Sequence, residues 1–151
     1  MSNPNIIFII PYRDREDELK IFRSNINQIT SNYETNEVDF LIIHQCDSRT
    51  FNRGAMKNIG FHVVKNLYPK NYKNITLVFN DVDICVNKNV DFEPENGSVK
   101  HFYGYLHTLG GIVSIKANDF ERVNGFPNFW SWGFEDKLFQ KRIMKENMKI
   151  D

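Results

Sequence analysis

The stretch Leu77-Val78-Phe79-Asn80-Asp81-Val82-Asp83 takes an apolar run directly into two acids that are separated by one residue. Residues 75–79 have the length and composition of a buried β-strand, so the acids are expected at the carboxyl edge of a sheet, where open α/β sheets bind ligands. In an extended chain Asp81 and Asp83 point to the same side, and two adjacent carboxylates repel unless a cation or a proton lies between them. The pattern predicts a site for Mn²⁺ or Mg²⁺, and an Asp-rich turn is the alternative interpretation.

Alternating strand and helix signals surround this stretch and predict one α/β domain over residues 1–151. Further strands are expected over residues 6–10, 38–43 and 112–115. The aromatic segment 101–105 is either an edge strand or the wall of a pocket, and the polar segment 86–98 predicts a loop. Apolar spacing predicts helices over residues 16–29, 53–67, 118–123 and 135–148, the third of them closed by Asn124-Gly125. The expected architecture is a mainly parallel sheet flanked by helices.

The bulk properties of the chain exclude several classes of protein. Equal numbers of basic and acidic residues, 19 of each, leave no electrostatic footprint for nucleic acid or an anionic membrane. No apolar run approaches the roughly 20 residues of a membrane span, and the N-terminus lacks a signal-peptide pattern, so we expect a soluble, cytoplasmic protein. Cys46 and Cys85 provide no disulfide framework and no metal-binding spacing, and both are predicted to be reduced residues of the core.

Three arginines are candidates for binding an anion. Arg13 and Arg15 follow the first predicted strand, where two guanidinium groups can clamp a diphosphate; a solvated charge cluster is the alternative. Arg53 falls in the first turn of a helix that Asn52 is predicted to cap, although the helix dipole disfavours a cation there. An anion docked at this helix N-terminus would explain Arg53, and simple exposure to solvent is the competing explanation.

The C-terminal part of the chain has features typical of a sugar-binding site. Trp130 and Trp132, the two tryptophans, are followed within four residues by Glu135 and Asp136. Both acids fall in the first turn of the last predicted helix, where the dipole alone explains them. An aromatic wall beside a carboxylate also suits a sugar. The aromatic ring packs on the apolar face of the sugar, and the carboxylate accepts hydrogen bonds from the sugar's hydroxyl groups. Upstream, Gly110-Gly111 permits a tight turn or the close approach of a ligand.

Five segments, in order along nearly the whole chain, resemble motifs of the β-1,4-galactosyltransferases, glycosyltransferase family 7. Ile9-Ile10-Pro11-Tyr12-Arg13-Asp14-Arg15 is similar to the family's IPFRNR segment, Phe51-Asn52-Arg53 to FNR, Asp81-Val82-Asp83 to DVD, and Gly110-Gly111 to its GG pair. Asn124-Gly125-Phe126-Pro127-Asn128, with Trp130-Ser131-Trp132-Gly133-Phe134-Glu135-Asp136 after it, is similar to NGFPN and WGWGGED. Each motif is modest by itself, but five of them in order are specific.

The resemblance implies a GT-A-like fold and an inverting, metal-assisted transfer of galactose or N-acetylgalactosamine from a UDP-sugar to a hydroxyl of a glycan or glycoconjugate acceptor. It makes Asp136 the catalytic base, and it makes Asp83, with Asp81, the ligands of Mn²⁺ or Mg²⁺. Trp132 would pack on the acceptor sugar, and Glu135 would accept a hydrogen bond from one of the sugar's hydroxyl groups. In full, the substrate-binding residues that it implies are Pro11, Tyr12, Arg13, Arg15, Phe51, Arg53, Val82, Thr108, Gly110, Gly111, Trp132, Gly133 and Glu135.

The chain departs from the family pattern at four of these motif positions or beside them. Ser131 and Phe134 replace family glycines, which predicts a stiffer loop. Lys137 stands where the family commonly has an acid, which predicts altered recognition of the acceptor. Thr108 falls where galactose-specific members carry a bulky tyrosine, and a smaller side chain resembles the members that accept N-acetylgalactosamine. The donor sugar is therefore left open between the two.

The family's other metal ligands, a histidine among them, have no counterpart within residues 1–151, and neither His101 nor His107 is expected to replace them. The sequence leaves open whether the catalytic domain is C-terminally truncated. A non-catalytic family member that binds sugar or nucleotide without transfer is therefore the main alternative function. A phosphotransferase of the haloacid dehalogenase type is a weaker alternative, because its acids usually follow the first strand and it would leave the tryptophans unexplained.

Overall fold

An interior strand with seven consecutive buried residues, β1 (Ile6–Tyr12), organises the sheet in the computed structural model, which describes residues 3–34, 36–86 and 90–151. β1 pairs in parallel with β2 (Val38–His44) and with β3 (Thr76–Asn80). Its run of isoleucines suits a strand that is covered on both faces. Beyond β3 follow β5 (Ile112–Lys116), β4 (Ser98–Tyr103) and β6 (Lys149–Ile150).

The strand order β2-β1-β3-β5-β4-β6 forms a mixed sheet that is mostly parallel, as the sequence predicts. Within the described residues only β5 runs against the others, because it pairs antiparallel with both β3 and β4. Of the two expectations for residues 101–105, the pocket wall is confirmed, because Tyr103, Gly104 and Tyr105 line a cleft. The edge strand is wrong, since the short β6 pairs with the first residues of β4 on its outer side. Tyr103 ends β4, and the segment that begins at Gly104 leaves the sheet.

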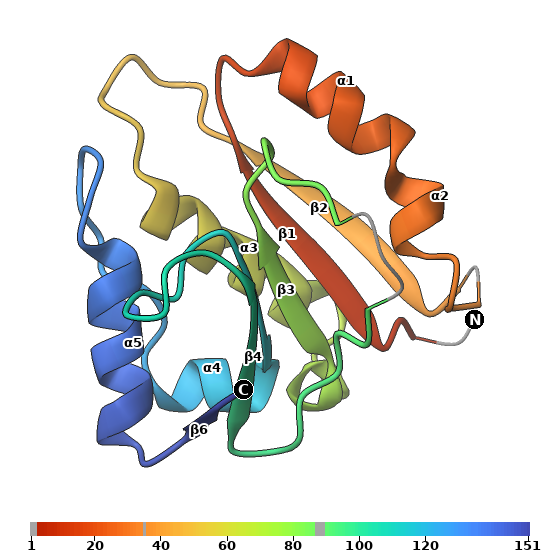
Figure 1. The fold of residues 1–151 in the computed structure, drawn as a ribbon, viewed down its shortest axis with the longest axis vertical. Helices are drawn as coiled ribbons and strands as arrows, with labels where there is room; N and C mark the ends of the chain where they lie inside the picture. Colours follow the sequence, from red (N-terminus) through yellow and green to blue (C-terminus); the bar gives the residue numbers. More distant parts are fainter. Residues whose placement is uncertain (1–2, 35, 87–89) are drawn as a thin grey trace.

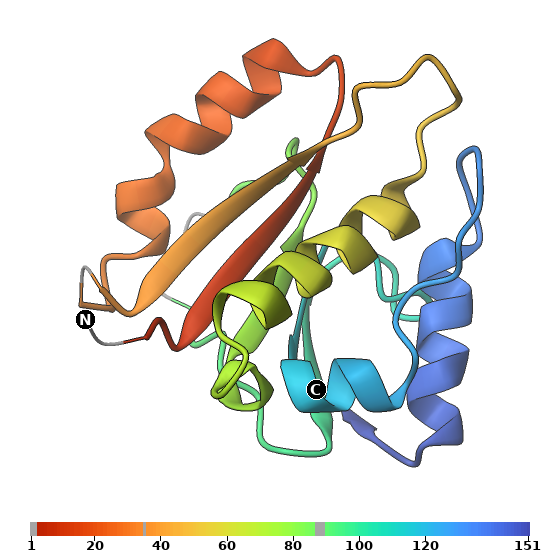
Figure 2. The same ribbon diagram turned by 180° about the vertical axis from the view of Figure 1, so that it is seen from behind.

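Helices cover both faces of the sheet, as Figures 1 and 2 show from opposite sides. On one face lie α1 (Glu16–Ser24) and α2 (Ile26–Ile29), and on the other lie α3 (Arg53–Leu67), α4 (Ala117–Arg122) and α5 (Glu135–Lys145). A short 3₁₀-helix, η1 (Tyr72–Asn74), precedes β3. The predicted α/β class with a sheet flanked by helices is therefore confirmed.

Two helix predictions need correction at their ends. The helix predicted over residues 16–29 is interrupted at Asn25, whose side-chain amide donates to the Ile21 carbonyl oxygen at 2.8 Å and competes with the helical hydrogen bonds. The last helix ends at Lys145, not at Met148, because Asn147 adopts a left-handed backbone with φ of 55° and turns the chain into β6. The predicted closure of α4 by Asn124-Gly125, both with positive φ, is as expected.

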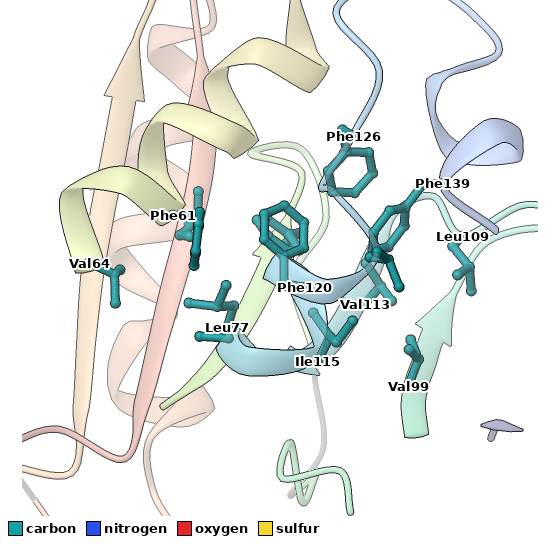
Figure 3. Close-up of a cluster of buried hydrophobic side chains, with 14 of the residues drawn as sticks. Phe61, Val64, Leu77, Val99, Leu109, Val113, Ile115, Phe120, Phe126 and Phe139 are labelled. Atoms are coloured by element: carbon teal, nitrogen blue, oxygen red, sulfur yellow. The ribbon is translucent and has the colours of Figure 1, made fainter. Parts of the chain in front are cut away.

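The core has one layer on each face of the sheet. On the α3–α4–α5 face, side chains of Leu77, Val113 and Ile115 from the sheet meet a group of phenylalanines from the helices and the segment before α5. Figure 3 shows Phe61, Phe120, Phe126 and Phe139 in this group. The rings of Phe126 and Phe139 stack with centroids 4.0 Å apart. This packing holds the segment before α5 against α3, and it thereby positions the residues that follow at the sheet's carboxyl edge.

Two further sequence predictions concern the core and a loop. Both cysteines are free thiols, but Cys46 is exposed and Cys85 is only half-buried, so their placement in the core is wrong. Cys46 follows β2, which is an edge strand and is only partly covered. Of the predicted loop 86–98, residues 87–89 lie outside the described residues.

None of the helices in the described part of the chain has the length and apolar character needed to cross a membrane.

Candidate active site

A cleft of about 820 Å³ opens at the carboxyl ends of β1 and β3. Five segments form it: the residues after β1, the first turn of α3, the turn after β3, the loop between β4 and β5, and the loop that leads into α5. In Figure 1 the β4–β5 loop, drawn in teal, lies between the sheet and α5. The predicted site residues that line the cleft are Pro11, Arg13, Arg15, Phe51, Arg53, Asp81, Val82, Asp83, Thr108, Gly110, Gly111, Trp132, Gly133, Glu135 and Asp136.

Tyr12 is the one predicted site residue that does not line this cleft. Successive side chains of a strand point to opposite faces, so Tyr12 points away from the side that its neighbours Pro11 and Arg13 share. Its ring lies in the core layer beneath α1 and packs edge-on against His44, with ring centroids 4.9 Å apart. The structure thus gives Tyr12 a packing role in place of the predicted contact with substrate.

Arg53 is the centre of the cleft's polar network. Its Nε and Nη2 donate to the two carboxylate oxygens of Asp81 at 2.7 and 2.6 Å. Its Nη1 donates to Glu135 Oε1 at 2.9 Å and to Asp136 Oδ2 at 2.6 Å. The anion predicted to stabilise an arginine in the first turn of α3 is therefore supplied by three carboxylates of the chain itself, from two separate segments.

Lys57 is a member of this network that sequence analysis did not find. The side chain is fully buried, and its Nζ lies 3.4 Å from Asp136 Oδ1 and 4.0 Å from Asp81 Oδ1. The ammonium also lies over the Phe126 ring, 4.5 Å from its centroid. Lys57 follows Arg53 by four residues, so both occupy the same face of α3. That spacing, within a buried helix face, is the signal that could have identified it.

The network shifts pKa values in the directions that its geometry requires. Burial opposes ionisation of Asp81, but Arg53 and Lys57 outweigh it and hold the pKa of this carboxyl below its ordinary range. Burial likewise opposes the charge on Arg53, and Asp81 and Asp136 outweigh it, so the pKa of Arg53 is raised. Burial, reinforced by the nearby charge of Arg53, lowers the pKa of Lys57. Asp81 and Arg53 are therefore a firmly ionised pair.

Asp81 and Asp83 do not continue strand β3. β3 ends at Asn80, and residues 81–84 form a turn in which the Ile84 N–H donates to the Asp81 carbonyl at 3.0 Å. The Asn80 side-chain amide donates to the carbonyls of Asp81 and Ile84 and closes the turn. As a result, Asp81 binds Arg53, whereas Asp83 is exposed on the cleft and has no ion-pair partner among the described residues.

This geometry decides how well the predicted metal site fits. Both oxygens of Asp81 accept from Arg53, so Asp81 has no free oxygen for a cation in this arrangement. Asp83 has free carboxylate oxygens, and a carboxylate is a suitable ligand for Mn²⁺ or Mg²⁺. Across residues 3–34, 36–86 and 90–151 no cluster of three or more histidine, cysteine, aspartate and glutamate side chains could hold a metal. The chain thus offers Asp83 as one ligand, and a bound diphosphate and water would have to supply others.

The loop between β4 and β5 forms the wall opposite the acids. Gly111 has a φ of +74°, and a Cβ there would meet the Tyr103 carbonyl oxygen at 2.3 Å, so only glycine fits. His101, which was not expected to bind a metal, has its Nε2 within 2.8 Å of the Gly110 carbonyl oxygen. His107 and Thr108 line the cleft. The Gly-Gly pair brings this wall against α5.

Gly110→Ala tests that close approach. A Cβ at residue 110 would lie 2.7 Å from Asp136 Oδ2, so the carboxylate must move away from its position beside Arg53. We expect the variant to fold and to lose roughly 1–2 kcal/mol of stability, because an atom is forced into a filled site. We also expect it to lose any activity that depends on Asp136. Thermal unfolding and activity are the two measurements; full activity would show that the position of Asp136 is unimportant.

The motif segments that lie far apart in sequence are joined by buried polar contacts. Asn52 caps α3, as predicted, by accepting from the Ala55 N–H at 2.9 Å, and its amide donates to Asn128 Oδ1 at 2.5 Å. A Cβ on Gly54 would meet the Pro127 carbonyl oxygen at 2.3 Å. The first turn of α3 and the segment before the tryptophans therefore pack directly on each other, which fixes Arg53 relative to α5.

The loop that carries the tryptophans keeps a glycine-like backbone at both positions where other residues replace family glycines. Ser131 has a backbone φ of 118° and Phe134 a φ of 65°. Residues other than glycine rarely adopt such values. Gly133, between them, also has a φ of 118°. Trp132 projects from this loop with 93% of its surface exposed, at the mouth of the cleft. A flat, exposed ring in this place can pack against a sugar.

Comparison with known proteins agrees with this geometry. A family model described as the N-terminal region of glycosyl transferase group 7 matches residues 1–92, and one described as the N-terminal domain of galactosyltransferase matches residues 95–151. The chain belongs to glycosyltransferase family 7. The resemblance of the five motifs is thereby confirmed, and the phosphotransferase alternative is excluded.

Curated relatives within family 7 are longer than this chain. The chain is 33% identical over 160 residues to the xylosylprotein 4-beta-galactosyltransferase of Caenorhabditis elegans, a match that covers 99% of this chain and 53% of the relative. It is 27% identical to beta-1,4-galactosyltransferase 1 of Mus musculus, with 99% and 39% covered. The chain thus spans about half the length of the first relative and less of the second.

Solved structures confirm the GT-A-like fold. The catalytic domain of a Drosophila beta-1,4-galactosyltransferase 7 in complex with xylobiose superposes with a TM-score of 0.82 at 26% identity, over 97% of this chain and 63% of that one. A mutant of that enzyme, solved with manganese, UDP-galactose and xylobiose, gives a TM-score of 0.78 at 25% identity over the same shares. A mannosyltransferase from Pyrobaculum calidifontis, at 13% identity and a TM-score of 0.68, shares the fold alone.

Proposed function

We propose that this family 7 chain carries the site of an inverting galactosyltransferase, which moves galactose from UDP-galactose to a hydroxyl of a glycan acceptor with the help of Mn²⁺ or Mg²⁺. One observation carries the proposal. Arginines for a diphosphate, an unpaired carboxylate for a cation, an exposed tryptophan for a sugar and a carboxylate for a proton all line one cleft. The curated relatives, which are named as β-1,4-galactosyltransferases, support galactose as the transferred sugar.

The donor end of the cleft is the region around Arg13, Arg15 and Asp83. Arg13 is held in place, since its Nη1 donates to the Arg49 carbonyl and its guanidinium lies over the Phe51 ring, 5.7 Å from the centroid. Arg15 is more exposed, with 59% of its side-chain surface accessible, and it pairs with Glu18. Guanidinium groups bind the oxygens of a diphosphate well. A metal ion on Asp83 would add neutralisation of the departing diphosphate.

Asp136 is the proposed base that takes the proton of the acceptor hydroxyl. It lies in the cleft, in the first turn of α5. Arg53 Nη1, 2.6 Å from Asp136 Oδ2, and Lys57 Nζ, 3.4 Å from Asp136 Oδ1, hold the carboxylate in place. In this proposal the hydroxyl loses its proton late, as the bond to the donor sugar breaks and the hydroxyl becomes more acidic. Attack from the face opposite the leaving group gives inversion, by the geometry known from inverting hydrolases.

Glu135 and Trp132 are proposed to position the acceptor sugar. Glu135 is buried, and its Oε2 accepts from the Gly133 N–H at 3.1 Å, so the carboxylate is tied to the tryptophan loop. A sugar packed on Trp132 would lie in the cleft that Glu135 and Asp136 also line. Positioning of this kind lowers the barrier by holding the hydroxyl in an attacking geometry.

Thr108 supports a second donor, UDP-N-acetylgalactosamine. It lines the cleft, and its side chain is smaller than the tyrosine of galactose-specific members. A non-catalytic member that binds sugar or nucleotide without transfer is the other candidate, and it is favoured because the described residues contain no cluster of three or more side chains that could hold a metal ion. Competition of the two UDP-sugars for the cleft separates the donors, and a transfer assay separates the functions.

Asp83→Asn is expected to weaken UDP binding in Mn²⁺ by about tenfold or more, because a neutral amide oxygen replaces the one free carboxylate. Binding without metal should change little, since the Asp83 side chain is exposed and forms no ion pair with the residues that the structure describes. Calorimetric titration of UDP, with and without Mn²⁺, is the measurement. Asp17→Asn, an exposed acid on α1 outside the cleft, is the matched control. Equal UDP affinity of the Asp83 variant and the wild type in Mn²⁺ would contradict the assignment of Asp83 as a metal ligand.

The same titration on the wild-type protein tests the proposed function. We expect UDP to bind, and to bind more tightly when Mn²⁺ is present. Binding that ignores the metal would favour the non-catalytic member, and a complete lack of UDP binding would contradict a donor site in this cleft.

A further inference from the structure

A second hollow of about 750 Å³ lies beside the cleft, on the outer side of the tryptophan loop and α5. It shares Trp132, Gly133, Phe134 and Lys137 with the cleft, so the two hollows form one continuous surface. We call the second hollow the outer groove. A ligand that reaches from the cleft past Trp132 would enter it.

The outer groove differs from the cleft in charge. Among the residues that the structure describes, the charged ones that line it are Lys137 and Lys141, and none of its lining residues is an acid. The lysines lie one turn apart on α5, so they share a face of the helix. Both are exposed, and neither has a carboxylate partner among the residues that the structure describes. The cleft, by contrast, is lined by four acids, Asp81, Asp83, Glu135 and Asp136.

Exposed aromatic rings line the rest of the outer groove. Trp130 and Phe129 are each about two-fifths exposed, Phe134 is 74% exposed, and all three face solvent in a hollow. The Arg49 guanidinium lies over the Trp130 ring, 3.8 Å from its centroid. Rings that pack on sugars, together with free cations, suit a saccharide that carries negative charge.

We propose that the outer groove binds the part of the acceptor beyond the reacting sugar, and that this part is acidic, with carboxylate or sulfate groups that meet Lys137 and Lys141. This inference rests on the proposed function, because it extends the acceptor side of the same cleft. It names the acceptor as an acidic oligosaccharide. A neutral sugar could use the rings but would leave two neighbouring ammonium groups without a partner.

A membrane surface is the other chemistry that aromatic rings and lysines can bind. The observations favour the saccharide for two reasons. The rings line a hollow that a chain of sugar units can fill, and the hollow leads directly to the carboxylates of the cleft. The chain as a whole has no excess of positive charge that would draw it to an anionic lipid surface.

The test uses a matched pair of xylobiose derivatives that differ by one carboxylate. Xylobiitol, whose second unit is an open-chain alditol, is the neutral probe, and xylobionate, the aldonic acid, has the same non-reducing sugar and the same open chain with a carboxylate in place of the terminal CH₂OH group. Of the two tryptophans, Trp130 lines the outer groove and not the cleft, so its indole N–H signal in NMR titrations reports binding in the outer groove, whereas Trp132 lines both hollows. We expect xylobionate to bind roughly three- to twentyfold more tightly at low salt, a preference that falls at about 0.5 M NaCl.

Variants connect the preference to the lysines. Lys137→Gln with Lys141→Gln should bring the two xylobiose derivatives to the same affinity. Lys145→Gln is the matched control, because Lys145 is exposed on the same helix and does not line the outer groove, and it should keep the preference. An acidic preference that survives in the double variant would overturn the assignment to these lysines.

Other outcomes overturn the inference without touching the proposed function. Equal affinities for the two xylobiose derivatives in the wild-type protein, or no binding of xylobionate, would show that the outer groove does not read acidic sugars. Vesicles of phosphatidylcholine and phosphatidylserine that perturb the indole signals while xylobionate does not would replace the saccharide by a membrane. UDP titration is independent of all of these, so loss of UDP binding would contradict the donor site alone.

Discussion

Replacement of Asp136 by asparagine is expected to remove galactose transfer and leave donor binding intact. Loss of a general base typically lowers a rate by about 10²–10⁴-fold, since the amide cannot take the proton of the acceptor hydroxyl. Donor binding is expected to persist because Arg13, Arg15 and Asp83 lie on the other segments of the cleft. The measurements are UDP-galactose turnover with an acceptor and calorimetric titration of UDP.

The variant should also fold, which makes the result interpretable. The network has three carboxylates, Asp81, Glu135 and Asp136, for the two cations Arg53 and Lys57. Removal of one negative charge therefore leaves each cation with a carboxylate partner. Asp91→Asn is a matched control, since Asp91 pairs with Lys100 at 2.8 Å and does not line the cleft. Substantial transfer by Asp136→Asn would rule the residue out as the base.

Arg53→Met is expected to have the largest effect on stability. The guanidinium is mostly buried and binds three carboxylates, which would be left with Lys57 as their one cation. Removal of one partner from a buried ionic network typically costs about 3–5 kcal/mol. That is a large share of the roughly 5–15 kcal/mol by which a domain of this size is stable. Urea denaturation measures the loss.

The pH dependence of this loss follows from the pKa of Asp81. Its folded-state pKa lies below the ordinary value of 3.8, so the ion pair's stabilisation is fully present above about pH 4 and is lost as pH falls through the folded-state value. The difference in unfolding free energy between the wild type and Arg53→Met should therefore be largest near neutral pH. It should shrink in acid, and a difference independent of pH would contradict an ionic origin.

Two further variants separate the ion pairs from simple loss of packing. Arg49→Met removes an arginine that also pairs with an aspartate, but its side chain is 64% exposed, so we expect a cost of at most about 1 kcal/mol. The double variant Arg53→Met with Asp81→Asn should lose less than the sum of its single variants, because each single change leaves the other buried charge unpaired. Strict additivity of the two losses would show that Arg53 and Asp81 are not coupled.

Local sequence signals predicted the framework of the fold. The apolar runs at β1 and β3 mark strands buried on both faces, and the Asn52 cap and the Asn124-Gly125 closure mark helix ends, because each depends only on neighbouring residues. β6 was missed because two residues carry no periodic pattern, and its place depends on pairing with β4. The interruption at Asn25 depends on one side chain that competes for a backbone carbonyl.

The site was predicted in outline, and its electrostatics were not. Every predicted site residue except Tyr12 lines the cleft, since each lies at the end of a predicted element. Sequence could not show that Asp81 would bind Arg53 and leave Asp83 alone, because that depends on the turn that Asn80 closes. Nor could it show that Lys57 is buried, because a lysine on a helix is usually exposed. Both features come from contacts between segments far apart in the chain.

Transfer of galactose by this cleft, as we propose it, is measured in the transfer reaction itself. The protein is incubated with UDP-galactose, Mn²⁺ and xylobiose or its aldonic acid, and the products are identified by mass spectrometry and by NMR of the new linkage. We predict a galactosylated product with inverted, β configuration, formed by the wild type and absent with Asp136→Asn. UDP that binds tightly while no acceptor is galactosylated would contradict galactose transfer and would identify a family member that binds without transfer.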